Sequence, residues 1–160
     1  MRIGVIGGGA SGMMAAITAA RVGAQVTIIE HTARVGKKIL STGNGKCNFT
    51  NQNLSKGDYN GNHPSFAEPA IRIFDNQKAL LFFEDCGMTV SCKRDGYYYP
   101  HSGQASTLLN VLRFQLDVLK IRVETDCYID TVQTDKDGKF IVKGRKKQFV
   151  FDRLILACGG

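Results

Sequence analysis

Apolar residues occur along this chain in short runs, and the first two runs flank a stretch of small residues. Residues 3–6 (I-G-V-I) and 25–29 (Q-V-T-I-I) have the length and β-branched content of buried strands. Residues 12–22 between them are rich in alanine, which suits a helix packed closely on a sheet, and Gly23 follows as a helix stop. The first 30 residues therefore predict a strand, a helix and a second strand.

Two later segments have the apolar spacing of helices. After Pro69 the pattern predicts two short helices divided near Asp75 and Asn76, and residues 104–119 predict one long amphipathic helix. The apolar face of the short helices is expected from Ile71, Phe74, Leu80, Leu81 and Phe83. The face of the long helix is expected from Leu108, Leu109, Leu112, Leu116 and Leu119. Residues 32–62 hold few apolar side chains and predict a long irregular loop.

The remaining runs predict strands. Residues 88–93 and 97–99 flank Asp95-Gly96, a typical hairpin turn, and Pro100 is expected to stop the second strand. Further strands are expected at 121–124, 128–134, 139–143 and 148–151, with a turn at Asp137-Gly138. Residues 153–157 (R-L-I-L-A) are expected to form a buried parallel strand. This order predicts a three-stranded antiparallel meander followed by a return to a parallel sheet.

The glycine-rich turn after the first run adds a candidate chemistry. Residues 7–12 read G-G-G-A-S-G, in which Gly7 permits a tight turn, Gly9 lets a pyrophosphate approach the backbone and Gly12 lets the helix pack closely on the strand. The N–H groups and dipole at the start of the helix favour a phosphate. Glu30 ends the second strand, at the distance where an acidic residue meets a ribose. A dinucleotide site is predicted.

A cleaved leader or a membrane span would also place uncharged residues at the N-terminus. Four glycines between residues 7 and 12 break the hydrophobic stretch that either would need, so we favour the nucleotide site. The length of 160 residues fits one domain with a core, since 43% of the residues are hydrophobic. Five scattered cysteines without a C-x-x-C pair indicate neither a disulfide framework nor a zinc site, and a cytoplasmic location is expected.

The net charge of +7 suggests an anionic partner, and the basic residues gather in two segments. Segment 34–38 (R-V-G-K-K) closely follows Glu30, where the phosphates of a cofactor would lie. Segment 143–147 (K-G-R-K-K) separates two apolar runs and is expected to form a solvated hairpin tip. Because no aromatic residues are interleaved with these charges and no recognition motif is present, we expect no nucleic-acid partner. We also expect no membrane partner.

Four pieces of the chain resemble one family. They are G-G-G-A-S-G-M-M-A-A (7–16), E-H-T-A-R-V-G-K-K-I-L-S-T-G-N-G-K-C-N-F-T-N (30–51), G-Y-Y-Y-P-H-S-G-Q-A (96–105) and L-I-L-A-C-G-G (154–160). Together they look like the bacterial NAD(P)/FAD-dependent oxidoreductase family that includes aminoacetone oxidase and a bile-acid ring reductase. The last piece reads A-C-G-G where the family usually has A-T-G-G, a mild departure that keeps the glycines.

The resemblance implies a Rossmann-like FAD-binding fold of the two-dinucleotide-binding flavoprotein type. This α/β fold has a parallel sheet and an antiparallel meander as crossover. By position, the residues implied to contact FAD are Gly7, Gly9, Ala10, Ser11, Gly12, Glu30, His31, Arg34, Lys37, Lys38, Ser41, Gly43, Asn44, Gly45, Cys47, Asn48, Ile129, Ala157 and Gly159. Within this set the loop 41–48 would approach the isoalloxazine ring, and the backbone of Ile129 would face adenine.

The implied activity is hydride transfer through FAD. A small-molecule substrate, with a reduced nicotinamide as candidate donor, would be the partner, and neither the substrate nor the oligomeric state follows from the sequence. Residues 1–160 would be the N-terminal FAD-binding part of a longer chain, without the substrate domain and the returning segment. Redox chemistry at Cys47 and acid–base chemistry at His101 are weaker hypotheses, since no partner cysteine or activating histidine lies near Cys47 in sequence.

Two alternatives stay open at this point. An NAD-dependent dehydrogenase could use the same strand, turn and helix, although the predicted meander departs from its alternating strands and helices. A truncated nucleotide-binding module without catalytic competence would share the glycine turn as well.

Overall fold

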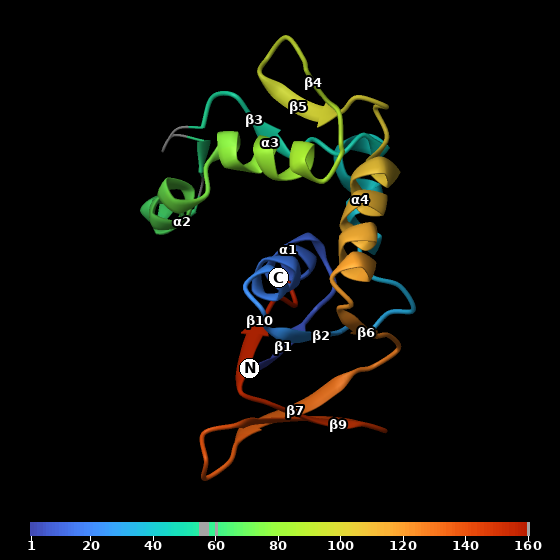
Figure 1. Ribbon diagram of the computed structural model, residues 1–160. Coiled ribbons are helices and arrows are strands. Elements are labelled where there is room, and N and C mark those ends of the chain that lie inside the picture. Colours follow the sequence, from blue (N-terminus) through green and yellow to red (C-terminus); the bar gives the residue numbers. More distant parts are fainter. Residues whose placement is uncertain (55–57, 60, 160) are drawn as a thin grey trace. The chain divides into compact units, whose positions relative to one another are not determined.

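A computed structural model of the chain describes residues 1–54, 58–59 and 61–159 (Figure 1). The chain divides into two compact units: unit 1 comprises Met1–Ile39 and Leu112–Gly160, and unit 2 comprises Leu40–Val111. Two elements cross from one unit to the other, the 3₁₀ segment η1 (Lys37–Gly45) and helix α4 (Ala105–Val118).

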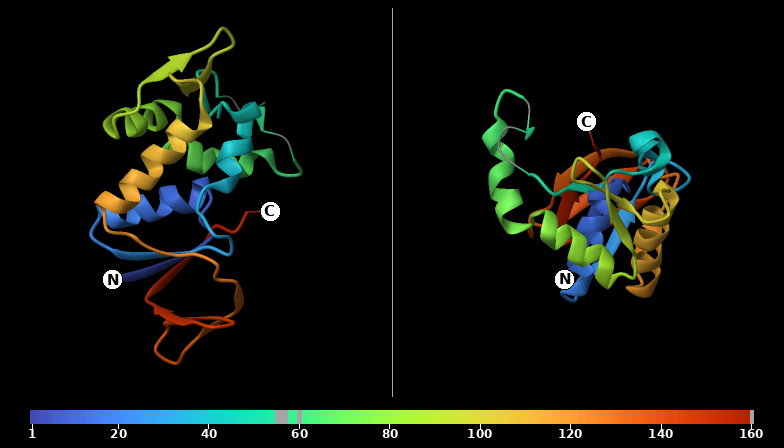
Figure 2. Two further views of the ribbon diagram at one scale, coloured as in Figure 1. Left: turned by 90° about the vertical axis from the view of Figure 1, so that its right-hand side faces the viewer. Right: turned by 90° about the horizontal axis from the view of Figure 1, so that it is seen from above.

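The described part of unit 1 contains a four-stranded parallel sheet in the order β10-β1-β2-β6. The strands are β1 (Arg2–Ile6), β2 (Gln25–Ile29), β6 (Arg122–Glu124) and β10 (Arg153–Leu156). Helix α1 (Ala10–Arg21) joins β1 to β2 and lies along one face of the sheet (Figure 2). The predicted strand, helix and strand are thus confirmed, with the helix starting two residues earlier than expected. Val5 and Ile28 are fully buried, as expected for strands covered on both faces.

The predicted meander is also confirmed. Strands β7 (Ile129–Thr134), β8 (Phe140–Gly144) and β9 (Gln148–Phe151) pair antiparallel in that order. The turn between β7 and β8 is closed by Asp135, whose side chain accepts hydrogen bonds from the N–H groups of Asp137 and Lys139, and Gly138 has φ +75° there. The parallel strand β10 follows β9 directly, so the meander is the crossover that the sequence predicts.

The meander packs on the sheet through a close contact between a ring and a glycine. A Cβ atom added at Gly4 in β1 would lie 2.4 Å from Cδ2 of Phe151 and 2.9 Å from Cδ1 of Leu154. Phe151 shares a buried cluster with Ile29, Cys127 and Val142. Gly4 therefore leaves the space that the Phe151 ring fills.

An ion-pair cluster joins the meander to strand β6. The carboxylate of Glu124, only 8% exposed, receives hydrogen bonds from Lys147 at the β8–β9 turn and from Arg122. The Lys147 hydrogen bond lowers the pKa of Glu124, burial raises it, and Arg122 lowers it further, so the net pKa is below the ordinary value. One buried carboxylate is therefore satisfied by two cations.

The described part of unit 2 combines short helices with a three-stranded antiparallel sheet in the order β3-β5-β4. Its elements are β3 (Thr50–Asn51), η3 (Pro64–Ala67), α2 (Glu68–Ile73), α3 (Asn76–Asp85), β4 (Val90–Cys92) and β5 (Tyr97–Pro100). The side chain of Asp75 caps α3 by accepting from the N–H of Lys78 at 2.9 Å. Asn76 donates to the carbonyls of Asn51 and Gln52, which ties α3 to β3. The two short helices and the hairpin are as predicted.

Several expectations are wrong in detail. Residues 153–157 are not a buried strand: β10 lies at the end of the strand order in the described sheet, and Leu156 is 70% exposed. The segment 32–62 is less irregular than expected, since it contains η1 and β3, while residues 55–57 and 60 lie outside the described residues. Phe74 and Leu81 are exposed, and Phe82 is buried instead of Leu81. The expectation that Pro100 stops the second strand of the hairpin is confirmed, since β5 ends at this residue.

We expect Gly4→Ala to lower the free energy of unfolding by about 1–3 kcal/mol, the usual cost of overpacking a filled core. The reason is the 2.4 Å approach of the new Cβ to the Phe151 ring. Urea denaturation measures the change. Phe151→Leu is the matched partner, because removing the ring should make the added methyl group less costly in the double variant. A loss in the double variant equal to the sum of the two single losses would contradict this packing.

Candidate functional site

The glycine turn after β1 is held between the ends of two neighbouring strands. Gly7 has φ +104°, and its N–H donates to the carbonyl of Ile29 at the end of β2, at 2.8 Å. A Cβ at Gly7 would lie 2.3 Å from the carbonyl oxygen of Ala157, the residue after β10. Ala157 in turn donates its N–H to the carbonyl of Ile6. The turn is thus fixed by backbone on both sides.

Gly12 and Gly9 are glycines for different reasons. A Cβ at Gly12 would lie 1.9 Å from the carbonyl oxygen of Gly7, so Gly12 is required by the packing of the helix on the turn. At Gly9 no heavy atom of the described residues would lie within 4 Å of an added Cβ. The space next to Gly9 is therefore open, as the approach of a ligand requires.

Helix α1 begins at this open position without a cap from a side chain. Gly9 is the N-cap residue, no side chain among the described residues caps the first turn, and that turn carries no acidic residue. The first N–H groups of an α-helix have no acceptor within the helix. Those of Ala10 and Ser11 therefore belong to a helix start that favours an anion.

Glu30 lies at the end of β2, and its carboxylate is held by the backbone around it. Oε2 accepts from the N–H of Gly8 at 2.7 Å and Oε1 from the N–H of Thr32 at 2.9 Å, with His31 Nδ1 at 3.1 Å from Oε1. Burial raises the pKa of Glu30, whereas the N–H groups of Thr32 and Gly8 and the neighbouring His31 lower it, and the net pKa is below the ordinary value. A carboxylate has about four acceptor positions, so Glu30 keeps capacity for a hydroxyl donor.

The loop after Glu30 is tied to the glycine turn and to α4. The N–H of Gly36 donates to the carbonyl of Gly8 at 2.7 Å, and Arg113 on α4 donates from Nη2 to the carbonyl of Val35 at 2.7 Å. A Cβ at Gly8 would lie 2.5 Å from Cγ1 of Val35. Our sequence reasoning missed Gly8, Val35, Gly36 and Arg113. Gly36 in R-V-G-K-K could have indicated a turn at this position. No residue near Arg113 in sequence indicates its contact with this loop.

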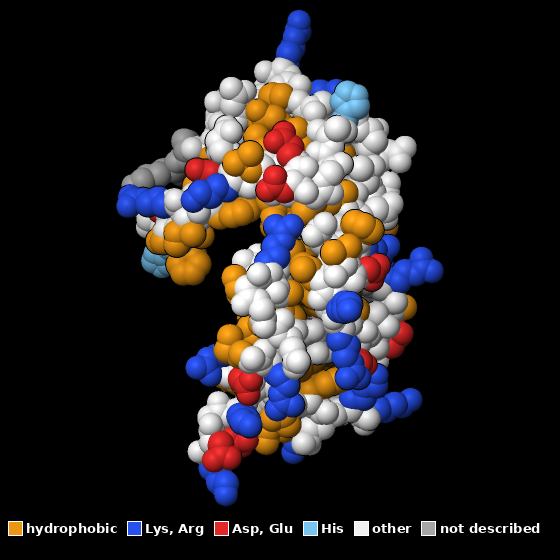
Figure 3. All heavy atoms as spheres, in the orientation of Figure 1, with side chains coloured by type: hydrophobic (Ala, Val, Ile, Leu, Met, Phe, Trp, Pro, Cys, Tyr) orange, Lys and Arg blue, Asp and Glu red, His pale blue; other side chains and the backbone are white. Residues whose placement is uncertain are grey.

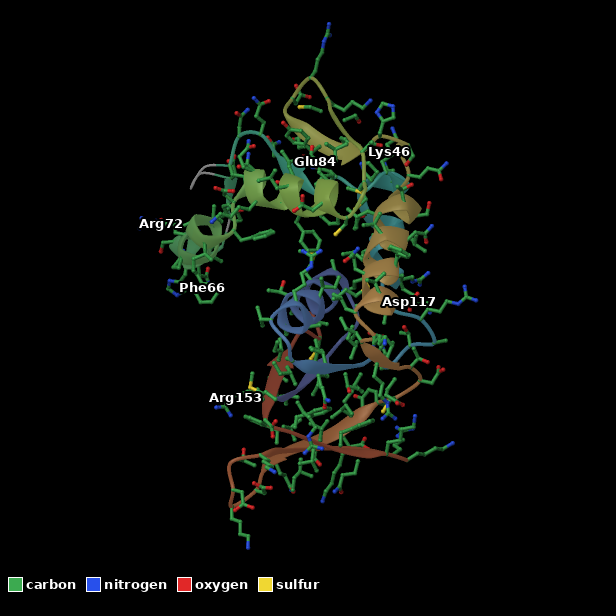
Figure 4. All side chains as sticks on the ribbon, viewed as in Figure 1. Lys46, Phe66, Arg72, Glu84, Asp117 and Arg153 are labelled. Atoms are coloured by element: carbon green, nitrogen blue, oxygen red, sulfur yellow. The ribbon has the colours of Figure 1, made fainter. Side chains whose placement is uncertain are left out.

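A shallow pocket of about 340 Å³ lies beside this loop, within unit 1. Its lining residues are Arg34, Val35, Arg113, Leu116, Asp117, Val123 and Thr125. Asp117 is labelled at the C-terminal part of α4 in Figure 4. The pocket therefore adjoins the loop that follows Glu30. Among its lining residues, Arg34 alone belongs to the set that the sequence predicts to bind the cofactor.

Thirteen of the predicted site residues belong to unit 1, and hydrogen bonds or close approaches join many of them. The N–H of Cys127 donates to the carbonyl of Glu30 at 3.0 Å. Ile129 follows Cys127 by two residues and is therefore close along the chain to this hydrogen bond. Nζ of Lys38 lies 3.8 Å from the position that a Cβ on Gly159 would occupy. Gly160, the last glycine of A-C-G-G, lies outside the described residues. The unit 1 residues are Gly7, Gly9, Ala10, Ser11, Gly12, Glu30, His31, Arg34, Lys37, Lys38, Ile129, Ala157 and Gly159.

The other six predicted site residues belong to unit 2 and form one loop. They are Ser41, Gly43, Asn44, Gly45, Cys47 and Asn48. Asn44 and Cys47 have φ of 53° and 56°, a conformation uncommon for residues other than glycine. Cys47 is buried and its N–H donates to the carbonyl of Thr42. The loop 41–48 is therefore sharply folded. His101, also in unit 2, is exposed, and its N–H donates a hydrogen bond to the carbonyl of Thr89.

The charge of the chain is concentrated on unit 1. Fifteen of the 21 basic residues and eight of the 14 acidic residues belong to it, so unit 2 carries equal numbers of each sign. Blue lysine and arginine side chains accordingly gather around the β7–β9 region in Figure 3. The described residues contain no cluster of three or more metal-ligating side chains, and none of the described helices is long and apolar enough to cross a membrane.

Comparisons with known proteins agree with this architecture. A family model described as the HI0933-like protein Rossmann domain matches residues 1–160. A 3-dehydro-bile acid delta(4,6)-reductase of Clostridium scindens is 42% identical, with 99% of this chain and 39% of that protein covered. A ribosomal RNA dihydrouridine synthase of Haemophilus influenzae is 28% identical, with 98% and 39% covered. The chain thus spans about two fifths of the length of these relatives.

A solved structure shows the same fold. The open conformation of a flavocytochrome c3 fumarate reductase superposes with a TM-score of 0.72 at 18% identity, covering 99% of this chain and 33% of that one. The predicted Rossmann-like fold with a parallel sheet and a meander is confirmed.

We expect Glu30→Gln to lower the free energy of unfolding by about 1–3 kcal/mol at neutral pH, because an amide presents only one oxygen to the two N–H donors. The pKa of Glu30 is below its usual value near 4.5 in the folded chain. Its contribution is therefore present above that value and is lost as the pH falls through the folded pKa. Urea denaturation from about pH 7 to about pH 3 should show the difference from wild type shrinking.

Glu84→Gln, at an exposed glutamate of α3, is the control and should change stability little across the same range. A Glu30→Gln deficit that stays constant with pH would mean that the charge of Glu30 does not stabilise the turn.

Proposed function

The chain belongs to the HI0933-like family, of which it forms the Rossmann domain, and from this premise we propose that it is the FAD-binding portion of a flavin-dependent oxidoreductase. Residues 1–160 would together be one functional domain of a longer enzyme, although they form two compact units. The observation that carries the proposal is the open approach at Gly9 beside a fixed carboxylate at Glu30.

The residues of the turn fit a dinucleotide. Gly9 leaves room for a pyrophosphate, and the uncapped N–H groups of α1 suit its charge. Glu30 retains acceptor capacity for a ribose hydroxyl while its own oxygens are already held in place. A carboxylate at this position disfavours a 2′-phosphate, so NADP is not expected in this site.

The crossover favours FAD over NAD as the occupant. A nicotinamide-binding fold continues as alternating strands and helices, whereas this chain inserts β7, β8 and β9 before β10. The segment between β6 and the meander also brings Cys127 against the Glu30 carbonyl, which supports adenine contact by the backbone of Ile129. The resemblance of residues 30–51 to the flavoprotein family supports the same assignment.

Other residues would orient the cofactor. Arg34, Lys37 and Lys38 would balance the phosphates, since charged donors bind phosphate oxygens strongly. The backbone of the loop 41–48 would approach the isoalloxazine ring, where its N–H groups and the amides of Asn44 and Asn48 can hold negative charge. Bound FAD supplies hydride chemistry, and the protein supplies orientation and electrostatics.

We propose an activated carbon–carbon double bond as the substrate group. One relative is named as a reductase of a 3-dehydro bile acid and the other as a synthase of dihydrouridine in ribosomal RNA. Both names describe a ring in which a carbon–carbon double bond is reduced. The higher identity of the bile-acid reductase favours a small-molecule enone as the substrate. We propose a reduced nicotinamide as the electron donor and the cytoplasm as the location. An RNA substrate is the second candidate, supported by the net charge of unit 1.

The visible spectrum of the purified full-length protein tests the cofactor. We expect a yellow protein whose flavin bands bleach under anaerobic conditions with NADH or NADPH and recover on addition of an enone. A colourless preparation that retains NAD would overturn the assignment. A bound flavin that no donor bleaches would leave the cofactor in place and overturn the redox activity.

Gly9→Ala should separate ligand approach from folding. The added methyl group meets no described protein atom within 4 Å, so the melting temperature without FAD should stay close to wild type. FAD affinity should fall at least about tenfold, the effect of roughly 1.4 kcal/mol, as measured by titration of FAD fluorescence. Gly12→Ala is the contrast: its methyl group would lie 1.9 Å from the Gly7 carbonyl oxygen, and it should lower both stability and affinity. Unchanged FAD affinity in Gly9→Ala would contradict the proposed pyrophosphate position.

A further inference from the structure

An exposed aromatic ring lies among basic side chains at one end of the β7–β9 sheet. The ring of Tyr128, which is 59% exposed, has the guanidinium carbon of Arg145 over it at 5.8 Å from the ring centre. A Cβ at Gly144 would lie 2.4 Å from the carbonyl oxygen of Tyr128, so the hairpin tip packs directly against this residue. The N–H of Gly144 donates to the carbonyl of Lys147 and closes the tip. Ring and guanidinium are therefore held together by local backbone structure.

More cations belong to the same hairpin and to strand β6. We name the group the basic hairpin surface and define it by Arg122, Tyr128, Lys143, Arg145, Lys146 and Lys147. Glu124 links Arg122 to Lys147 and compensates only one of their two charges. Asp126 and Asp130 flank Tyr128 in sequence, yet the five cations still outnumber these three carboxylates. The surface is net positive, although its acidic members reduce its field.

The basic hairpin surface is not used by the proposed cofactor site. FAD contacts are assigned to the backbone of Ile129 and to the residues around Glu30, and neither assignment involves Arg145 or Lys146. The linear sequence argued against a nucleic-acid partner because no aromatic residue was interleaved with the basic segment 143–147. The fold supplies that aromatic residue, since Tyr128 lies 17 positions from Arg145 in sequence but under its guanidinium group.

We propose that the basic hairpin surface binds single-stranded nucleic acid. Phosphates would contact Lys143, Arg145 and Lys146, and a base would stack on Tyr128, since stacking on aromatic rings and basic grooves are the two general means of binding single strands. A membrane fits less well because the turn residues Arg145, Lys146 and Lys147 are all cationic, and Tyr128 beside them is a single aromatic ring rather than an apolar face. A purely acidic protein as the partner would need only the cations and would make no use of the exposed Tyr128 ring.

Fluorescence anisotropy with a labelled RNA of about 12 nucleotides tests this proposal, and DNA of the same sequence separates the two sources of single strands. The purified full-length protein is titrated between about 50 and 200 mM salt. Replacing Arg145 and Lys146 by glutamine should reduce the salt slope of log K by about 1.4, for two lost phosphate contacts. Tyr128→Ala should weaken binding by about 5- to 100-fold with the salt slope kept. Tyr128→Phe, which keeps the ring, should bind like wild type.

The matched control replaces Lys136 and Lys139 by glutamine, which removes the same charge at the opposite end of the same sheet. It should leave the affinity and the slope near wild type, and thermal melting checks that every variant is folded. Three results would each overturn the proposal: no RNA or DNA binding at low salt, an equal loss in the control, or unchanged affinity in Tyr128→Ala. Binding to phosphatidylserine vesicles that Tyr128→Ala and the Arg145/Lys146 variant weaken as much as RNA binding would assign the surface to a membrane instead. The spectrum of the flavin is read separately, so failure here leaves the cofactor proposal intact.

Discussion

At the glycine turn after β1, backbone approaches backbone too closely for any side chain, and the arrangement of unit 1 depends on this contact. A methyl group at Gly12 would lie 1.9 Å from the Gly7 carbonyl oxygen, and one at Gly7 would lie 2.3 Å from the Ala157 carbonyl oxygen. Helix α1 can therefore start directly above the strand ends, where its unpaired N–H groups are open to a ligand. The same contact fixes the start of α1 relative to β10. The glycine turn 7–12 and the segment after β10 therefore lie side by side.

Glu30 connects this turn to the rest of the site through a balance of opposed effects. Burial disfavours its charged form, but the hydrogen bonds from Thr32 and Gly8 together with the neighbouring His31 favour it by more, and the carboxylate remains charged beside the turn. Because Gly36 also binds the Gly8 carbonyl, two loops and one side chain hold each other. The residue that a ribose would contact is therefore positioned before any ligand binds, which reduces the ordering that binding would require.

The sequence predicted those parts of the fold that local patterns encode. The glycine turn, α1, α4 and the meander each have a periodicity or a turn residue that acts within a few positions, and all four are confirmed. Features that depend on distant partners were missed or wrong. The exposure of Leu156 follows from the place of β10 in the strand order, and the role of Arg113 follows from its contact with Val35, far away in sequence. The short strand β3 carries too little apolar pattern to be read without its partner β5.

The positions of the charged residues distinguish two proposed functions that the net charge of the chain does not distinguish. A surplus of seven positive charges on the whole chain is compatible with many anionic partners, but unit 2 has no share in it. Within unit 1, segment 34–38 adjoins Glu30, and we assign its charges to the phosphates of the proposed dinucleotide. The segment 143–147 covers the end of β8 and the turn to β9, where Arg145 lies over the ring of the exposed Tyr128. Lys147 is held by the buried Glu124. Since stability gains little from exposed like charges that repel one another, the remaining cations Arg145 and Lys146 are better explained by a partner than by the fold.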